Sequence, residues 1–145
     1  MAIDRATRWV FIRIYRAKTA VNARRFLCDL EQACSLRMRP ILTHNAKVST
    51  NRLFGLRKRQ ANGKLDFDQL CAEFGIKHRL SPPARLQTDG LVQRFKGRVE
   101  EALQSPYFQS AQDLETTLHR YVPLYNQKLQ KPALGSKTPL QVMME

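Results

Sequence analysis

The chain has 145 residues, which is the length of one domain with a real hydrophobic core, and it carries 25 Lys and Arg against 12 Asp and Glu, a formal net charge of +13. This excess of positive charge favours a polyanionic partner, nucleic acid first, although a basic protein without such a partner has the same composition. The sequence contains no apolar run of membrane-spanning length and no signal-peptide core, so we expect a cytoplasmic protein with no membrane partner. Its three cysteines, Cys28, Cys34 and Cys71, are odd in number and lack a CxxC spacing, which predicts reduced core residues and excludes a disulfide framework or zinc site.

The first residues predict a β-hairpin. Apolar side chains alternate along residues 9–15, which indicates a strand covered on both faces and places Trp9 and Phe11 in a core. Residues 5–8 then form the turn from a preceding strand that contains Asp4. Only three residues precede Asp4, whereas strands are usually longer, so we expect a chain that begins within its first strand.

A helix, a short strand and a basic connection are expected next. Thr19 predicts the N-cap of a helix that runs to about Cys34, with apolar residues at the helical period. Residues 40–43 predict a short strand whose end presents His44. Residues 51–63 predict a connection rich in Arg and Lys.

The middle of the chain predicts a second helix and a further strand. Residues 67–74 have the helical pattern and are closed by Gly75, and residues 76–80 predict the strand. Two histidines, His78 here and His119 further on, are isolated in the sequence. This isolation favours a surface or hydrogen-bonded histidine over a metal ligand.

The last part predicts helices. Pro82 and Pro83 hold an extended loop, after which a helix is expected to open at Thr88-Asp89-Gly90. Its buried stripe consists of Leu91, Phe95, Val99 and Leu103. Residues 106–145 predict a helical extension, in which Ser110 and Asp113 form a capping box and Pro123 interrupts the helix that follows.

Four stretches together carry a pattern that covers nearly the whole chain: Ala2-Ile3-Asp4-Arg5, Ile41-Leu42-Thr43 with Asn45, Gln87-Thr88 to Arg94-Phe95, and Leu124-Tyr125-Asn126 with Thr138-Pro139-Leu140. In this order they resemble the integrase core of bacterial insertion-sequence transposases, an Asp-Asp-Glu class that includes the retroviral integrases. The alternation of strands and helices already favours α/β layers. The resemblance implies the ribonuclease H-like version, a three-layer fold whose mixed sheet has helices on both faces, here with a truncated first strand. It also implies one integrase-core-like domain over residues 1–145, without the family's N-terminal helix-turn-helix.

The resemblance implies a catalytic site of three carboxylates that hold two Mg²⁺ or Mn²⁺ ions for DNA strand cleavage and transfer. Asp4 matches the first carboxylate. His44 stands where the family has its second Asp, and Gln93 stands where it has its Glu. A neutral amide and an imidazole are poor ligands for Mg²⁺. We therefore expect that Asp4 is the one metal ligand kept, that no ion is bound and that the enzyme is inactive.

Neighbouring carboxylates do not offer a credible replacement. Asp89 lies four residues before Gln93, about 6 Å along a helix axis, but its residue type favours the helix N-cap. Glu100 lies about 10 Å beyond Gln93, too far to share one ion. Asp66 and Asp68 are expected to be solvated or capping residues.

Contact with the DNA backbone is the function expected to survive. Six basic residues surround the site helix or lie in the basic connection: Arg57, Lys58, Arg59, Arg94, Lys96 and Arg98. Such contacts are independent of DNA sequence and depend strongly on salt. Taken singly, each of these residues is more simply explained as an ordinary solvated charge.

Three hypotheses follow. The first is a transposase remnant with an integrase-core fold and no strand-transfer activity. The second is a weak nuclease in which Asp4, Asp89 and His44 bind Mn²⁺ or another transition metal. The third is a basic DNA-binding or interaction module that assembles with itself or with an intact transposase.

Overall fold

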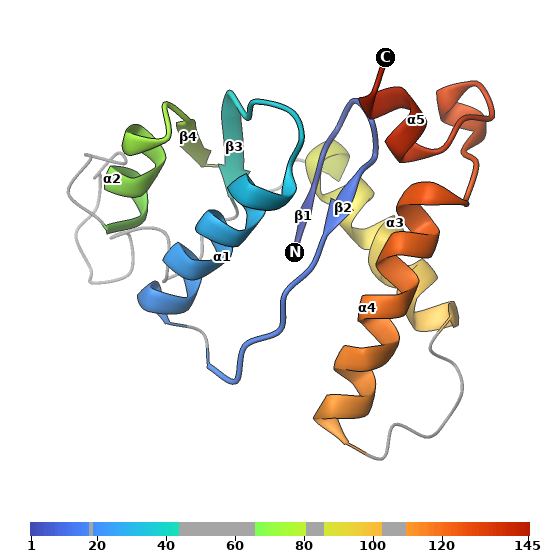
Figure 1. Ribbon diagram of the computed structural model, residues 1–145, viewed down its shortest axis with the longest axis horizontal. Coiled ribbons are helices and arrows are strands. Elements are labelled where there is room, and N and C mark those ends of the chain that lie inside the picture. The colour runs from blue at the N-terminus through green and yellow to red at the C-terminus, as the bar shows by residue number, and fades with distance from the viewer. Residues whose placement is uncertain (18, 44–65, 81–85, 103–109) are drawn as a thin grey trace. The chain divides into compact units, whose positions relative to one another are not determined.

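The chain forms a mixed α/β structure, seen in a computed structural model that describes residues 1–17, 19–43, 66–80, 86–102 and 110–145 (Figure 1). The described residues divide into two compact units. The first unit combines residues 1–14 with the chain from residue 86 onward, and the second spans residues 15–85. None of the described helices is long and apolar enough to cross a membrane.

The first unit begins with a short antiparallel hairpin. Strand β1 (Ala2–Ile3) pairs with β2 (Val10–Phe11), with Ala2 opposite Phe11. Strand β2 is much shorter than the predicted strand over residues 9–15. The alternation of apolar residues predicts which side chains are covered. A strand also needs hydrogen-bond partners for its backbone. In the described part of the chain, β1 provides such partners along two residues of β2.

Two long helices complete the core of this unit. Helix α3 (Leu86–Ala102) and helix α4 (Ala111–Gln127) contribute Phe95 and Tyr125, which pack with Val10 of β2. The rings of Phe95 and Tyr125 meet edge to face, with centroids 5.0 Å apart at 89°. Residues packed around these three are Ile3, Ile12, Val99, Tyr121 and Leu129. The prediction of Phe95 and Val99 as part of a buried stripe is confirmed, and Leu103 lies outside the described residues.

The buried side chain of Asn126 joins helix α4 to the hairpin. Its Oδ1 accepts from the backbone N–H of Val10 at 3.0 Å, and its Nδ2 donates to the Val10 carbonyl at 2.8 Å. One amide therefore satisfies both backbone groups of a fully buried strand residue, as a neighbouring strand would. These two bonds connect positions 116 residues apart in the sequence.

Two predictions about these helices are wrong. Helix α3 begins at Leu86, so Asp89 lies inside the helix and is not its N-cap. Proline disfavours helix for the residue before it but is tolerated in a first turn, so a helix can open soon after Pro83. Helix α4 continues through Pro123, since the missing N–H removes one backbone bond while residues on both sides, Tyr121 and Tyr125, stay packed.

The helix caps were predicted in part. Ser110 does cap α4, with its hydroxyl accepting from the Asp113 N–H at 3.1 Å. A reciprocal capping box, which the sequence reading missed, opens the final helix α5 (Pro139–Met143), where Thr138 and Gln141 exchange bonds. Between α4 and α5 lies a single 3₁₀ turn, Pro132–Leu134, closed by Gly135 at a φ of 63°.

The second unit contains two helices and a parallel strand pair. Helix α1 (Ala20–Ala33) is capped by Thr19, and helix α2 (Asp66–Glu73) is followed by Gly75 at a φ of 67°. Strands β3 (Pro40–Thr43) and β4 (Lys77–Leu80) run parallel. The core of the unit consists of Leu27, Phe67, Leu70, Cys71 and Ile76. The bounds of these elements agree with the predicted ones to within a residue at each end, and Thr19 caps α1 as predicted.

The three cysteines are free thiols, as predicted from their number and spacing. Cys71 is buried, and burial together with the nearby Asp68 carboxylate raises the pKa of its thiol to about 11. The thiol therefore stays protonated and unreactive at neutral pH.

The Asn126 amide predicts a specific stability defect. Replacement Asn126→Ala leaves the N–H and the carbonyl of buried Val10 without partners, which we expect to lower the free energy of unfolding by about 2–4 kcal/mol. The matched control is Gln127→Ala, which truncates the exposed neighbour on the same helix and should change stability by less than about 0.5 kcal/mol. Urea denaturation followed by circular dichroism measures both. Equal stability of the two variants would show that the two bonds are not needed.

Candidate functional site

Asp4 lies at the end of β1, where its carboxylate organises the hairpin turn. Its Oδ2 accepts two hydrogen bonds from Thr7, from the backbone N–H at 2.7 Å and from the hydroxyl at 2.6 Å. The backbone of Asp4 pairs with Trp9 and Arg8, and Arg8 has a φ of 63° that completes the turn. The side chain of Asp4 is otherwise exposed, so one of its two oxygens has a structural role in the turn.

Gln93 is exposed on helix α3, in the same unit as Asp4. At about 100° per residue, it lies on the side of the helix away from the buried Phe95. His44, the third family position, lies outside the described residues. The structure therefore places two of the three positions in one unit and gives no geometry for the complete set.

As metal ligands, the described side chains do not fit a pair of Mg²⁺ ions. Asp4 supplies one carboxylate whose Oδ2 is already occupied by Thr7, and Gln93 supplies a neutral amide. Mg²⁺ requires several hard oxygen ligands, usually charged. Within the described part of the chain, no three His, Cys, Asp or Glu side chains lie together in a way that could hold a metal ion.

Three predicted DNA-binding residues are exposed on α3: Arg94, Lys96 and Arg98. The helical period puts Arg94 and Arg98 on one flank of the buried stripe and Lys96, about 200° from each, on the other flank. Arg94 also donates from Nε to the Gly90 carbonyl at 3.0 Å. These three cations do not form one patch, and Arg57, Lys58 and Arg59 lie outside the described residues.

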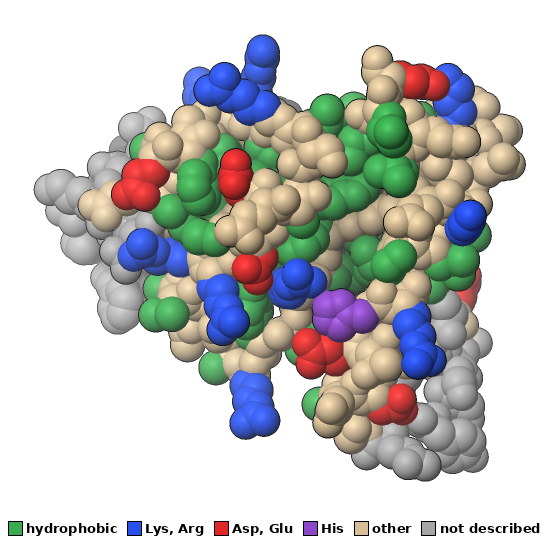
Figure 2. Space-filling model, viewed as in Figure 1, with side chains coloured by type: hydrophobic (Ala, Val, Ile, Leu, Met, Phe, Trp, Pro, Cys, Tyr) green, Lys and Arg blue, Asp and Glu red, His purple; other side chains and the backbone are tan. Residues whose placement is uncertain are grey.

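The face in Figure 2 agrees with a dispersed charge pattern. Lys and Arg side chains are spread over that face with Asp and Glu between them, and hydrophobic side chains are visible among them. On this face a single basic patch does not stand out among the described residues.

A buried lysine, which the sequence reading missed, lies in the loop after helix α4. Lys131 is 6% exposed, and its Nζ lies 3.9 Å from the centroid of the Tyr125 ring. Burial and the nearby Arg98 lower the pKa of Lys131 to about 8. Burial raises the pKa of Tyr125, an effect that Arg98 and Arg8 oppose. In the sequence, the signal for this site is a lysine four residues after the end of a helix with tyrosines one turn apart.

Asp68, His78 and Thr43 form a buried polar chain in the second unit. The Asp68 carboxylate bonds to His78 Nδ1, and His78 Nε2 lies 2.7 Å from the Thr43 hydroxyl. Since a carboxylate only accepts, Nδ1 of His78 carries the proton and donates it to Asp68. The side chains of His78 and Asp68 are 4% and 5% exposed. The prediction of a solvated or capping Asp68 is therefore wrong, and that of a hydrogen-bonded His78 is confirmed.

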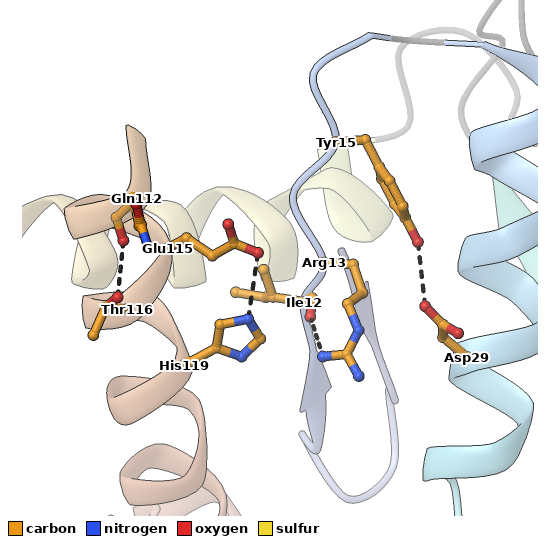
Figure 3. A network of polar contacts seen from close by, with 8 residues as sticks. All are labelled: Ile12, Arg13, Tyr15, Asp29, Gln112, Glu115, Thr116 and His119. Atoms are coloured by element: carbon orange, nitrogen blue, oxygen red, sulfur yellow. Dashed lines mark hydrogen bonds and ion pairs between the residues drawn. The ribbon is translucent and has the colours of Figure 1, made fainter. Parts of the chain in front are cut away.

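A shallow groove of about 140 Å³ lies between helix α4 and the chain around β2. His119 lies at this groove, exposed and 3.6 Å from Glu115 one turn earlier (Figure 3), which confirms it as a surface histidine. Figure 3 also shows Arg13 donating to the Ile12 carbonyl at 3.4 Å. Asp4 and Gln93 do not line the groove, so it is separate from the family catalytic positions.

Solved structures similar to this chain include an integrase catalytic core and an intasome. One is the catalytic core domain of BIV integrase, which matches 98% of this chain and 82% of its own length with a TM-score of 0.70 at 17% identity. Another belongs to the simian T-cell lymphotropic virus intasome in complex with PP2A regulatory subunit B56 gamma, with a TM-score of 0.65 and 18% identity over 90% of this chain. This chain spans 42% of the length of that second chain. No protein-family model and no curated protein matches the sequence. The likeness shows the fold, and it confirms the predicted ribonuclease H-like α/β class.

The buried Asp68–His78 pair predicts a large effect of removing one partner. We expect Asp68→Ala to lower the free energy of unfolding by about 2–4 kcal/mol, because the buried imidazole loses the acceptor for its Nδ1 proton. Glu73→Ala removes an exposed carboxylate from the same helix and should cost less than about 0.5 kcal/mol. Chemical denaturation compares the two variants, and a neutral Asp68→Ala would contradict a structural role for the chain of three residues.

Proposed function

We propose that this chain is a DNA-binding relative of the integrase and transposase catalytic cores that does not catalyse strand transfer. The observation that carries the proposal is the chemistry at the three family catalytic positions, where Asp4 is accompanied by His44 and Gln93. The integrase-core fold supports the relationship, and the resemblance in sequence favours insertion-sequence transposases within it. The intact site residue in this proposal is Asp4, and the other two positions are altered.

The loss of activity follows from the charge that two divalent ions require. Two dications held close together repel each other strongly, and carboxylates offset this repulsion. Asp4 alone supplies one negative charge, and its Oδ2 already serves the turn through Thr7. An imidazole at position 44 favours softer metals than Mg²⁺, and the Gln93 amide contributes no charge.

Binding to the DNA backbone does not need these ions. The net charge of +13 favours a polyanion, and Arg94, Lys96 and Arg98 present exposed cations on the helix that carries Gln93. Assembly with a second copy or with an intact relative is compatible with the proposal, and the intasome comparison motivates it.

One observation keeps a second candidate open. Helix α3 begins at Leu86, so Asp89 is not used as its N-cap and lies four residues before Gln93 on the same helix. Residues four apart face the same side of a helix. A weak Mn²⁺-dependent nuclease that uses Asp4, Asp89 and His44 is therefore the alternative function.

Metal titration tests the loss of activity. We expect calorimetry of the unmodified chain to show no saturable binding of Mg²⁺, whereas His44→Asp combined with Gln93→Glu restores binding by returning both carboxylates. Gln93→Glu alone is the control, since two carboxylates should bind more weakly than three. Saturable Mg²⁺ binding by the unmodified chain would contradict the proposal. Mn²⁺-dependent nicking of DNA that Asp89→Asn abolishes would favour the alternative.

Salt dependence tests the DNA-binding part. The logarithm of the association constant should fall linearly with the logarithm of the salt concentration, with no difference between unrelated DNA sequences. We expect Arg94→Ala to reduce the slope by about 0.9 if Arg94 neutralises one phosphate, whereas Glu100→Ala, which removes an exposed carboxylate on the same helix, should not weaken binding. Fluorescence anisotropy with a labelled duplex measures both. Absence of binding at low salt would exclude DNA as the partner.

A further inference from the structure

The side chain of Lys131 is largely buried, and its ammonium group has no acidic partner among the described residues. Lys131 is 6% exposed, and its contact with a neighbouring side chain is the Tyr125 ring at 3.9 Å. Asp68 Oδ2 is the one fully buried side-chain oxygen or nitrogen without a hydrogen bond in the described chain. The Lys131 ammonium, which also has no hydrogen-bond partner there, must therefore keep an opening to solvent.

The charge that acts on this ammonium is also positive. Arg98 lies three residues after Phe95, whose ring meets Tyr125 edge to face. Arg98 of helix α3 acts on both Lys131 and Tyr125, and Arg8 of the hairpin turn acts on Tyr125. The carboxylate of Glu101 raises the pKa of the neighbouring Tyr121, but it is not among the charges that shift the pKa of Lys131. The loop after α4, helix α3 and the hairpin turn thus each contribute a cation that acts on Tyr125. No described carboxylate offsets the charge of Lys131.

The backbone holds Lys131 firmly in this position. Its N–H donates to the Lys137 carbonyl at 3.0 Å, and its own carbonyl accepts from Leu134 at 2.9 Å and from Ser136 at 3.0 Å. Gly135, at a φ of 63°, allows the tight turn that makes these bonds possible. The side chain itself is restricted by burial and by its contact with the Tyr125 ring, so it loses little additional rotamer freedom when its ammonium group is bound.

Burying an unpaired charge lowers the stability of the folded chain. Removing an ammonium from water is unfavourable, a like charge nearby adds to the cost, and the face of one aromatic ring offsets part of it. A bound anion would supply what the described residues lack. The guanidinium of Arg98, which acts on Lys131, carries several N–H donors of the kind that bind phosphate oxygens.

We propose that Lys131 and Arg98, beside Tyr125, form a binding site for a phosphodiester group of a nucleic-acid strand. This site rests on the proposed DNA-binding function and adds a defined contact to it. It lies at the loop after helix α4 and uses neither Asp4 nor Gln93. Phosphate binding there does not depend on a metal ion.

Lys131→Met tests the site, with Lys128→Met as a matched control that removes the same charge from an exposed lysine three residues earlier. We expect Lys131→Met to weaken binding of a DNA duplex about tenfold at low salt and to reduce the salt slope by about 0.9. Lys128→Met should reduce affinity much less. Lys131→Arg keeps the charge and should retain most of the affinity.

The outcomes separate this site from the general proposal. If the unmodified chain does not bind DNA, the proposed function fails. If it binds DNA and Lys131→Met equals Lys128→Met, the function stands and the site is wrong. Circular dichroism and thermal melting show whether Lys131→Met is folded. If it is not, Arg98→Gln, a change on the exposed flank of α3, replaces it with the same expectation.

A direct readout uses the lysine itself. In ¹³C-methylated protein, the Lys131 signal should titrate with a pKa of about 8 in the absence of anions. Inorganic phosphate or a short oligonucleotide should raise this pKa, because a bound anion stabilises the protonated amine. A rise with the oligonucleotide alone supports a polymer-specific site, and a rise with both supports the shared phosphate chemistry. No change with either probe would overturn the proposal.

The pH dependence of stability provides a further test. Because the pKa of Lys131 is lowered from 10.5 to about 8 on folding, the unfolded chain binds more protons than the folded chain between these values. Stability contributed by this group therefore increases as pH rises from about 8 towards 10.5, and the protonated amine is destabilising below pH 8. Relative to the unmodified chain, Lys131→Met should lose this increase, and saturating phosphate should diminish it. Denaturation curves over this pH range measure the difference.

Discussion

The two hydrogen bonds between Asn126 and Val10 are the constraint on which the first unit depends. Strand β2 is two residues long and pairs with an equally short β1, so its ladder alone satisfies few backbone groups. A fully buried Val10 would leave its N–H and carbonyl without partners if helix α4 did not supply an amide. The same helix contributes Tyr125 to the core beside it, so one turn of α4 provides both the polar and the apolar closure of the hairpin. This also explains how α4 tolerates Pro123, because the contacts that hold its last turns do not depend on an unbroken backbone ladder.

The hairpin closed in this way positions Asp4, which the resemblance in sequence predicts as the first catalytic carboxylate. Asp4 directly follows Ile3, which packs on the core of Val10, Phe95 and Tyr125. In this chain the carboxylate has a structural partner in Thr7, and its turn ends at Arg8 in a left-handed conformation. A carboxylate that stabilises a turn can remain in a sequence for that reason alone. The presence of Asp4 is therefore weaker support for catalysis than its match to a family position suggests. The residue types at positions 44 and 93 bear more directly on metal binding, because neither side chain is a carboxylate.

Elements whose signals are local were predictable from the sequence. Thr19 and Ser110 were recognised as caps, Gly75 as the end of a helix, and residues 40–43 as a strand, because each depends on residue type and spacing within one turn or strand. The fold class came from the resemblance, since the order of short elements alone fits several α/β arrangements. Features that depend on distant partners were missed. Asp68 is typical of a solvated helix residue until β4 brings His78 to it, and Lys131 is an ordinary loop lysine until Tyr125 and Arg98 surround it. The start of α3 and the passage of α4 through Pro123 were predicted wrongly, because tertiary packing outweighed local preference.

Replacement of metal-binding carboxylates changes the electrostatics of such a unit in two ways. It removes the charge that would hold divalent ions, and it also removes negative charge that would repel DNA in the absence of those ions. The cation beside Tyr125, Lys131, then has no described carboxylate to balance it. Three carboxylates repel a phosphate backbone strongly unless cations offset their charge, whereas a single carboxylate repels it less. In the proposed function, loss of catalysis and metal-independent affinity for phosphate are therefore two consequences of the same change in charge.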